Sequence, residues 1–316
     1  MLNLKRLPFI SKLVQRHSQE PLLDVDEIKG LAASLQLDYQ HELAMRTRQL
    51  YAGAQQSSHR GEGMDFLENR QYLLGDNPGH INWRLSARLG GLHTRVFEED
   101  KQSQTLVITD RRPGMWFGTQ QQLKVKQAVN SAVLFMFAAA NRHHAFASLQ
   151  IENNYRCSDF QSGDSLAIKQ AQQLARVDNK VDLATESVSL AETLSYVLQV
   201  YPLGNEVILI SNFSDLDKRA CGSLNAIAQH NDVTAVYITD PADTCLPRAG
   251  SVDTVSTSAG EPVAIDTSDP LLRSHYQKIG EQKHQAVIQS LTQNGAFCIE
   301  LSTHQDAWQA LRRVLR

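Results

Sequence analysis

From residue 93 onward the chain alternates between short apolar runs and longer amphipathic runs, and this alternation most limits what it can fold into. Buried strands are expected where short apolar runs lie between turn residues, at 105–109, 145–151, 206–210, 232–239 and 297–301. Helices are expected between them, at 121–141, 165–176, 188–201, 216–230, 269–293 and 304–315. The pattern predicts an α/β fold of the Rossmann type, with a mostly parallel sheet and helices on both faces.

The expected domain boundary lies between residues 92 and 93, because an edge-strand pattern at residues 94–98 opens the regular part, 93–316. Residues 1–92 are expected to form a small helical and irregular module. Within it, Asp24 followed three residues later by Glu27 predicts a capping box that opens a helix. Residues 1–17 carry basic residues and no acid. A solvated terminus is the favoured interpretation, and contact with a membrane surface is the alternative.

Composition and charge argue against several classes of protein. The 31 lysines and arginines against 34 acids give a net charge of −3, which argues against a nucleic-acid binder. The four cysteines form no C-x-x-C pair, as expected of reduced thiols in a cytoplasmic protein. The longest apolar run, residues 132–140, is far shorter than the about 20 residues of a transmembrane helix. A cytoplasmic protein without a transmembrane segment is therefore expected.

Charged and aromatic side chains cluster between residues 70 and 88. An Asn-Pro pair at 77–78 suits the start of a short helix, and the paired glycines at 90–91 suit its end. The cluster consists of Arg70, Tyr72, Gly75, Asp76, Trp83, Arg84 and Arg88.

Two members of this cluster pose an electrostatic problem. On the expected helix Arg84 and Arg88 lie one turn apart, so they repel each other unless a carboxylate or phosphate lies between them. Asp76 and Glu68 are the candidate partners within the chain. A structural ion-pair network is favoured over a ligand site.

The cluster also carries a family resemblance. R-x-Y-x-x-G-D at 70–76 and I-N-W-R-L-S-A-R at 81–88 resemble the signature of the domain of unknown function 58 family (DUF 58). The segment H-R-G-E-G-M-D-F at 59–66 resembles the lead-in to that signature. His80 and Asn82 replace a common Arg and Asp, so a charged contact in relatives is expected to be a neutral hydrogen bond here. The resemblance covers about residues 24–316 and implies a von Willebrand factor A-like C-terminal domain.

That second resemblance implies a divalent-cation site at the carboxyl ends of the strands, built from a D-x-S-x-S loop, a Thr and another Asp. Here the first loop reads D-R-R-P-G, so Arg112 and Gly114 stand where the two serines would be. The second Asp falls at Asn212, next to Ser211. A fixed guanidinium beside a cation position opposes cation binding, so the site is expected to be degenerate and without metal. An alternative site from Asp110, Thr185 and Asp215 is the remaining route to a bound ion.

Two interpretations of Arg111 and Arg112 remain open. Their guanidiniums either bind a carboxylate or phosphate of a partner, or Arg112 pairs internally with Asp110 and fills the vacated site. The apolar loop 115–118 that follows is either an exposed contact patch or packs under the first helix of the domain.

The sequence favours an interaction role over catalysis. It contains no G-x-S-x-G elbow, P-loop or dinucleotide-binding glycine motif. The family resemblance implies a non-enzymatic adaptor whose partners are a MoxR-type AAA+ ATPase and membrane-bound von Willebrand factor A proteins, in protein maturation or stress tolerance. The alternative is a hydrolase or anionic-ligand-binding protein that uses the Arg/Asp cluster of residues 70–88 together with Asp110.

Overall fold

The computed structural model describes residues 21–37, 66–73, 75–97, 103–177, 187–201, 204–246, 250–254 and 263–315. The chain divides into two compact units. The larger unit comprises Met1–Leu43 and Ser103–Arg316, and the smaller unit comprises Ala44–Gln102. The parallel sheet belongs to the larger unit, and the 70–88 cluster belongs to the smaller one.

The larger unit is built on a six-stranded sheet. Neighbouring strands run parallel, except that the short edge strand β5 runs antiparallel to β4. In spatial order the strands are β10 (Phe297–Ser302), β7 (Asp232–Thr239), β6 (Glu206–Ser211), β3 (Gln104–Asp110), β4 (Ala145–Ile151) and β5 (Tyr155–Cys157). The predicted α/β fold with a mostly parallel sheet is confirmed.

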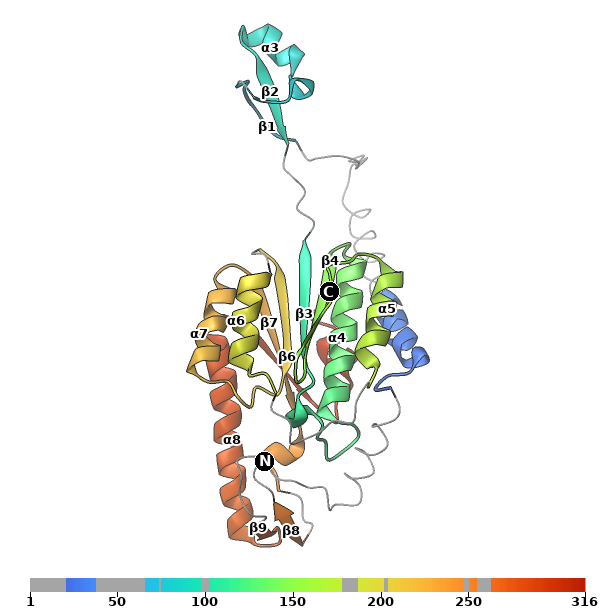
Figure 1. Cartoon of the computed structure of the whole chain (residues 1–316), viewed down its shortest axis with the longest axis vertical. Coiled ribbons are helices and arrows are strands. Elements are labelled where there is room, and N and C mark those ends of the chain that lie inside the picture. Colours follow the sequence, from blue (N-terminus) through green and yellow to red (C-terminus); the bar gives the residue numbers. More distant parts are fainter. Residues whose placement is uncertain are drawn as a thin grey trace, which may run out of the picture. The chain divides into compact units, whose positions relative to one another are not determined.

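Helices cover both faces of this sheet (Figure 1). One face carries α4 (Lys124–Asn141), α5 (Asp164–Ala175) and α9 (Ala307–Leu311), and the other carries α6 (Leu190–Val200), α7 (Lys218–Ala228) and α8 (Pro270–Gln293). Side chains of β3 alternate between the two cores: Val107 is buried on the α4 face, whereas Leu106 and Ile108 are buried on the α6 face. This alternation is what a strand covered on both sides requires. No helix in the described residues is long and apolar enough to span a bilayer.

The N-terminal helix, residues 25–37, belongs to the larger unit. The predicted capping box is present: the Glu27 amide donates to the Asp24 side chain at 2.7 Å, and the Asp24 amide donates to the Glu27 side chain at 3.0 Å. Ile28 and Leu35 are buried in the core that contains α4 and α5. The sequence-based division at residue 92 grouped this helix with the 70–88 cluster, whereas its apolar side chains pack on the other unit.

The smaller unit is an antiparallel strand pair with a helical insertion. It contains β1 (Phe66–Gln71), the 3₁₀ turn η1 (Pro78–His80), α3 (Trp83–Leu89) and β2 (His93–Phe97). The edge-strand pattern expected to open the larger domain is β2, which pairs with β1 instead of the six-stranded sheet. The Tyr72 amide donates to the Leu92 carbonyl at 2.8 Å and closes the insertion between the two strands.

A hairpin lies between β7 and α8. It consists of β8 (Ser251–Thr254) and β9 (Val263–Asp266). α8 begins beside this hairpin and extends past the carboxyl ends of the strands (Figure 1). The Tyr276 hydroxyl of α8 donates to the Ala242 carbonyl at 2.7 Å, which joins the helix to the 3₁₀ turn η3 (Pro241–Asp243).

The loop between β3 and α4 makes a tight turn at Gly118. A Cβ atom at this position would overlap the carbonyl oxygen of Gln122 and lie 2.9 Å from the Cα atom of Leu123. The Lys124 amide donates to the Phe117 carbonyl at 2.8 Å and fixes the two sides of the turn. Only a residue without a Cβ atom fits here without moving the backbone.

Gly118→Ala is expected to destabilise the larger unit by about 1–3 kcal/mol, because the added methyl group displaces backbone atoms in a buried loop. Gly222→Ala is the matched control, since a Cβ atom there meets nothing within 4 Å. At this exposed position of helix α7, Gly222→Ala is expected to leave the stability unchanged or to raise it by up to about 1 kcal/mol. Urea unfolding of both variants measures the difference. Equal stabilities would show that the turn relaxes freely.

Candidate functional site

Polar side chains gather where the parallel strands of the larger unit end. β3 ends at Asp110, β6 ends at Ser211, and Asp240 follows β7. Because these strands are neighbours in the sheet, their carboxyl ends meet along one edge, where open α/β sheets bind ligands. This edge is called the strand-end edge below.

The guanidinium of Arg112 lies between two carboxylates at this edge. Its Nε donates to Asp110 Oδ1 at 3.0 Å, and its Nη2 donates to Asp110 Oδ2 at 2.7 Å. On its other side Nη1 donates to Asp215 Oδ2 at 2.5 Å, and Nη2 donates to Asp215 Oδ1 at 2.9 Å. Both contacts are bidentate, which is the strongest geometry for an arginine and a carboxylate.

Other groups complete the coordination of both carboxylates. The Ser211 hydroxyl donates to Asp110 Oδ2 at 2.6 Å, and the Leu190 amide, in the first turn of α6, donates to Asp215 Oδ2 at 2.9 Å. Arg112 Nη1 also donates to the Val188 carbonyl at 3.2 Å. Strands β3 and β6 and helix α6 are thus joined through one cation.

Burial and charge act on this cluster in opposite directions. Burial alone would lower the pKa of the Arg112 guanidinium, but hydrogen bonds and charges from Asp110 and Asp215 hold that pKa above its ordinary value. Burial alone would raise the pKa of the Asp215 carboxyl, but Arg112 holds it below its ordinary value. Arg112 and Asp215 are therefore both charged at neutral pH.

The residues of this edge do not fit the divalent cation that the von Willebrand factor A resemblance implies. The Arg112 guanidinium occupies the space between Asp110 and Asp215, and Gly114 supplies no side-chain oxygen. The Asn212 side chain accepts a hydrogen bond from the Ser214 amide at 3.2 Å. The alternative ligand Thr185 lies outside the described residues. Its two partners, Asp110 and Asp215, both face Arg112.

The geometry favours one of the two interpretations of the paired arginines. Arg112 pairs internally with Asp110, as described above. Arg111 is buried as well: its Nη1 donates to Gln150 Oε1 at 2.9 Å and to the Leu174 carbonyl at 2.8 Å, and its Nε lies 3.2 Å from Glu152 Oε1. Both guanidiniums are therefore used inside the unit, and the interpretation that they bind a partner's carboxylate is not supported.

Two interpretations of the apolar loop 115–118 were open, an exposed contact patch or packing under the first helix of the domain. The structure supports the second. Met115 and Trp116 are buried in the core beneath α4. The Trp116 indole donates to the Arg111 carbonyl at 2.9 Å, so its polar atom is satisfied. The loop is not an exposed contact patch at these two residues.

A second network, around Asp240, was not predicted. Its carboxylate accepts hydrogen bonds from the Thr119 amide at 2.9 Å, the Thr119 hydroxyl at 2.5 Å and the Thr303 hydroxyl at 2.6 Å. Buried Lys124 pairs with Asp243 at 2.7 Å. These groups come from three segments that are far apart in the sequence, so no local spacing indicates the network as a whole. The S-x-x-E capping box of Ser189 and Glu192 was the detectable signal that α6 begins beside the edge.

In the smaller unit, the R-x-Y-x-x-G-D signature forms a closed turn. Arg70 Nη1 and Nη2 donate to the two Asp76 oxygens at 2.9 and 2.8 Å. The Tyr72 hydroxyl donates to the Asp76 carbonyl at 3.1 Å, and the Leu73 amide donates to the Asp76 carboxylate at 2.9 Å. Gly75 has a φ of 111°, which favours glycine. The hydrogen bond from Arg70, followed by that from Leu73, lowers the pKa of Asp76.

The prediction of one continuous helix after Asn77 is wrong. Asn77 caps the 3₁₀ turn η1, the backbone is extended at Ile81, and Asn82 caps a second segment, α3. The Asn82 side chain also donates to Asn69 Oδ1 at 3.0 Å. This hydrogen bond is neutral, but it joins Asn82 to Asn69 and is a different contact from the one expected between positions 80 and 82.

The proposed pairing of Arg84 and Arg88 with Asp76 is also wrong, because Asp76 pairs with Arg70. Both helix arginines are exposed, and neither has an ion-pair partner among the described residues. Trp83 is 66% exposed. The side chain of Glu68, the other candidate partner, lies outside the described side chains.

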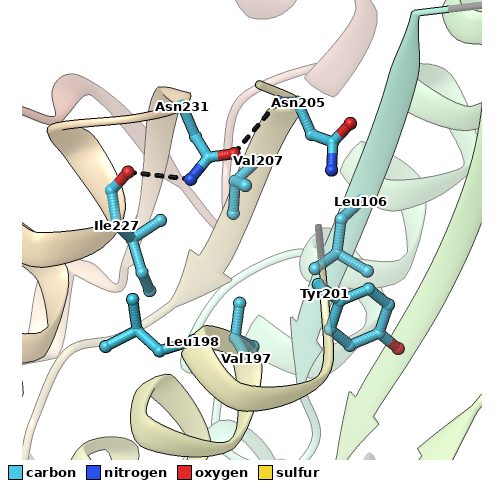
Figure 2. Close-up of a pocket in the computed structure, with 8 residues that line it drawn as sticks. All are labelled: Leu106, Val197, Leu198, Tyr201, Asn205, Val207, Ile227 and Asn231. Carbon is cyan, nitrogen blue, oxygen red and sulfur yellow. Dashed lines mark hydrogen bonds between the residues drawn. The ribbon is translucent and has the colours of Figure 1, made fainter. Parts of the chain in front are cut away.

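Figure 2 shows a hollow in the larger unit lined by Leu106, Val197, Leu198, Tyr201, Asn205, Val207, Ile227 and Asn231. Leu106 and Val207 lie near the beginnings of β3 and β6, so the hollow is at the opposite end of the strands from Asp110. Its lining is mostly apolar, and it has room for about one water molecule. It contains no acidic, basic or thiol group and is too small for a substrate.

The hydrolase hypothesis requires a carboxylate that can accept a proton from a substrate. Asp110 is bound to Arg112 and Ser211, and Asp76 is bound to Arg70. Pairing with Arg70 lowers the pKa of Asp76 and makes it a weaker base. Arg112 and Ser211 occupy both carboxylate oxygens of Asp110. The arrangement within each unit therefore gives this hypothesis no support.

Comparisons with known proteins agree with the two resemblances. The family model described as "Protein of unknown function DUF58" matches residues 68–286. Uncharacterized proteins of Mycobacterium tuberculosis and Mycobacterium bovis are 26% identical over 295 residues, which cover 91% of this chain and 89% of theirs.

Similar solved structures include von Willebrand factor A domains. The conserved hypothetical protein BatB from Bacteroides thetaiotaomicron has a TM-score of 0.45 at 10% identity, over 67% of this chain and 95% of that chain. A von Willebrand factor type A structure from Catenulispora acidiphila has a TM-score of 0.35 at 11% identity, over 60% and 43% of the two chains. The fold assignment rests on the strand order and the two helical layers, not on these scores.

Arg112→Met is expected to destabilise the larger unit by about 3 kcal/mol at neutral pH, because it leaves two carboxylates unpaired. Removing one partner of a buried ion pair costs about 3–5 kcal/mol, and the lower value is expected here because the Asp215 side chain is 35% exposed. In the wild type the lowered pKa of Asp215 contributes stability above its ordinary value of 3.8, and this contribution is lost as the pH falls further. In the variant the unpaired carboxylates take up protons as the pH falls. The difference in unfolding free energy between the wild type and the variant is therefore expected to narrow below about pH 4.

Urea unfolding between neutral pH and pH 3 measures this deficit. Arg156→Met is the control, because Arg156 makes a partly exposed pair with Glu152 at 3.5 Å and its loss is expected to cost about 0.5 kcal/mol. An equal loss of unfolding free energy at neutral pH and at pH 3 would show that the unpaired carboxylates do not cause the destabilisation of Arg112→Met.

The pKa of the Asp76 carboxyl, followed by NMR, is expected to lie below its ordinary value of 3.8. Arg70→Gln is expected to raise it, since it removes the strongest hydrogen bond to the carboxylate. Arg84→Gln is the matched control and is expected to leave it unchanged. A larger response to Arg84→Gln than to Arg70→Gln would restore the pairing that the structure contradicts.

Proposed function

Because the chain belongs to the family described as protein of unknown function DUF58, we propose that it is a non-enzymatic adaptor that binds other proteins. We further propose that its partner is a MoxR-type AAA+ ATPase, and that the pair acts in protein maturation or stress tolerance in the cytoplasm. Membrane-bound von Willebrand factor A proteins are proposed as a second class of partner. The ATPase and the process are implied by the family resemblance, and the cytoplasmic location was expected from the composition of the chain.

The observation that carries the adaptor role is the internal pairing of Arg112. The charged groups at the strand-end edge are bound to one another: Arg112 to Asp110 and Asp215, and Lys124 to Asp243. In the described part of the chain, this edge offers fixed shape and hydrogen-bonding loops, and its ion-paired groups are not suited to proton transfer. Such a surface suits recognition of another protein better than chemistry on a substrate.

The same pairing supports a contact that needs no metal ion. In a divalent-cation site the cation supplies the positive charge between carboxylates. Here the guanidinium of Arg112 supplies that charge, with bidentate contacts to both Asp110 and Asp215. We therefore propose that binding at this edge is independent of Mg²⁺ and Mn²⁺.

A pull-down of the tagged full chain from native lysate, with Mg²⁺ and nucleotide present to preserve ATPase assemblies, tests the partner. Mass spectrometry is expected to identify an AAA+ ATPase of the MoxR type with the tagged chain and not with the tag alone. Recovery of proteins without any AAA+ ATPase would contradict the proposed partner, and recovery of none would contradict the adaptor role.

Thermal unfolding of the purified protein tests metal independence separately. Neither Mg²⁺ nor Mn²⁺ is expected to change the melting temperature of the wild type. Arg112→Ser/Gly114→Ser restores two hydroxyl ligands and removes the guanidinium, so its melting temperature is expected to rise with Mg²⁺. A rise in the wild type that Asp110→Ala abolishes would contradict metal independence.

A further inference from the structure

One side of helix α3 in the smaller unit presents an aromatic ring beside two guanidiniums. Trp83, Arg84, Ala87 and Arg88 are all exposed, and Trp83 retains 66% of its accessible surface. In a helix, residues at positions i, i+1, i+4 and i+5 lie on one side. These four residues are called the α3 face below.

The α3 face carries positive charge that the described residues do not neutralise. Cβ atoms one helical turn apart are separated by about 5–6 Å, so the guanidiniums of Arg84 and Arg88 repel each other. Neither has an ion-pair partner among the described residues, because Asp76 is bound to Arg70. A carboxylate placed between the two guanidiniums would convert this repulsion into two charge-assisted hydrogen bonds.

Residues 66–97 of the smaller unit are basic, in contrast to the chain as a whole. Residues 66–97 carry four arginines against Glu68 and Asp76, whereas the net charge of the full chain is −3. Electrostatic complementarity therefore directs an acidic partner to this unit rather than to the larger one.

Most of the large apolar side chains that the structure describes in the smaller unit lie in solvent. Leu73 is 63% exposed, Leu89 is 62% exposed and Leu92 is 47% exposed, in addition to Trp83. Among residues 69–73 and 75–95, the buried ones are Ile81, Ser86 and Thr94. Exposed apolar surface of this kind, next to charged groups, is typical of sites that bind other proteins.

The α3 face is held on a defined scaffold. The Asn82 side chain accepts the Leu85 amide at 3.2 Å, and the Ser86 hydroxyl accepts the His93 amide at 2.9 Å. Gly90, with a φ of 75°, ends the helix. Because the helix is capped at both ends and tied to β2, the side chains of its outer face are preorganised for a ligand.

We propose that the α3 face binds an acidic segment of a partner protein. Carboxylates of that segment pair with Arg84 and Arg88, and an apolar side chain of the segment packs on the ring of Trp83. This inference rests on the proposed function only in taking protein binding as the activity. It assigns the contact to a surface different from the strand-end edge.

The chemistry of the α3 face favours an acidic peptide over a nucleic acid. Two guanidiniums on one turn match a short cluster of carboxylates, whereas nucleic-acid binders present an extended basic stripe along the phosphate backbone. The net negative charge of the full chain, −3, also does not favour binding of a polyanion of that length.

Fluorescence anisotropy with the full-length protein tests this proposal. The probe is a fluorescein-labelled peptide of Glu and Asp residues around a central Leu, and the control peptide carries Gln and Asn in place of the acids. The wild type is expected to bind the acidic peptide and not the neutral one, with an affinity that falls as salt is added.

Arg84→Glu/Arg88→Glu is expected to weaken binding of the acidic peptide by about tenfold or more, because it replaces attraction with repulsion. Trp83→Ala is expected to weaken it by about threefold to tenfold. Arg312→Glu/Arg313→Glu makes the same charge change at two exposed arginines of the larger unit and is expected to bind like the wild type. Circular dichroism and thermal unfolding confirm that each variant is folded.

Three outcomes would overturn the proposal: equal binding of the acidic and neutral peptides, wild-type affinity in the folded Arg84→Glu/Arg88→Glu variant, or tighter binding of a single-stranded oligonucleotide than of the acidic peptide. The ATPase pull-down separates this proposal from the proposed function. If the α3 variant loses the acidic peptide but keeps the ATPase, the α3 face is supported and the ATPase binds elsewhere. If the wild type binds the acidic peptide but recovers no ATPase, the proposed partner fails and the α3 face stands.

Discussion

The strand-end edge depends on one guanidinium placed between two carboxylates. Asp110 at the end of β3 and Asp215 after β6 carry like charges, and Arg112 lies between them with bidentate contacts to each. The Leu190 amide and the Val188 carbonyl bind the same cluster, so the start of α6 is fixed by it as well. Hydrogen bonds in such a network support one another in a low-dielectric setting.

The two units use their ion pairs differently. In the larger unit buried cations at the strand-end edge are paired, Arg112 with Asp110 and Asp215, and Lys124 with Asp243. In the smaller unit the pair of Arg70 and Asp76 shapes a turn, and this leaves Arg84 and Arg88 to face outward. The guanidiniums that remain available to an anion therefore lie on α3, whereas the guanidinium of Arg112 at the strand-end edge is already paired.

Local patterns predicted most of the fold. Alternating apolar runs identified the strands of the sheet, and the capping box of Asp24 and Glu27 forms as expected. The predicted domain boundary, between residues 92 and 93, differs from the end of the smaller unit at Gln102. The pattern of β2 indicated an edge strand, but such a pattern does not show which sheet the strand joins. The continuous helix after Asn77 failed because Asn82 offers a second cap.

The site was less predictable, because its partners are distant in sequence. Spacing on a helix indicated that Arg84 and Arg88 need an anion, but the turn at Gly75 brings Asp76 to Arg70 instead. The internal pairing of Arg112 likewise depends on Asp215, which is 103 residues away in the sequence. Asp215 comes near Arg112 because β6 lies beside β3 in the sheet.

Arg112 is covalently attached two residues from Asp110, and this has a consequence for regulation. A bound metal ion has a dissociation constant, so the occupancy of its site follows the ion concentration of the surroundings. A tethered guanidinium has no such equilibrium and, since its pKa is raised, no accessible deprotonation either. The charge between Asp110 and Asp215 is therefore set at synthesis, and the strand-end edge has one electrostatic state where an ion-dependent site has two.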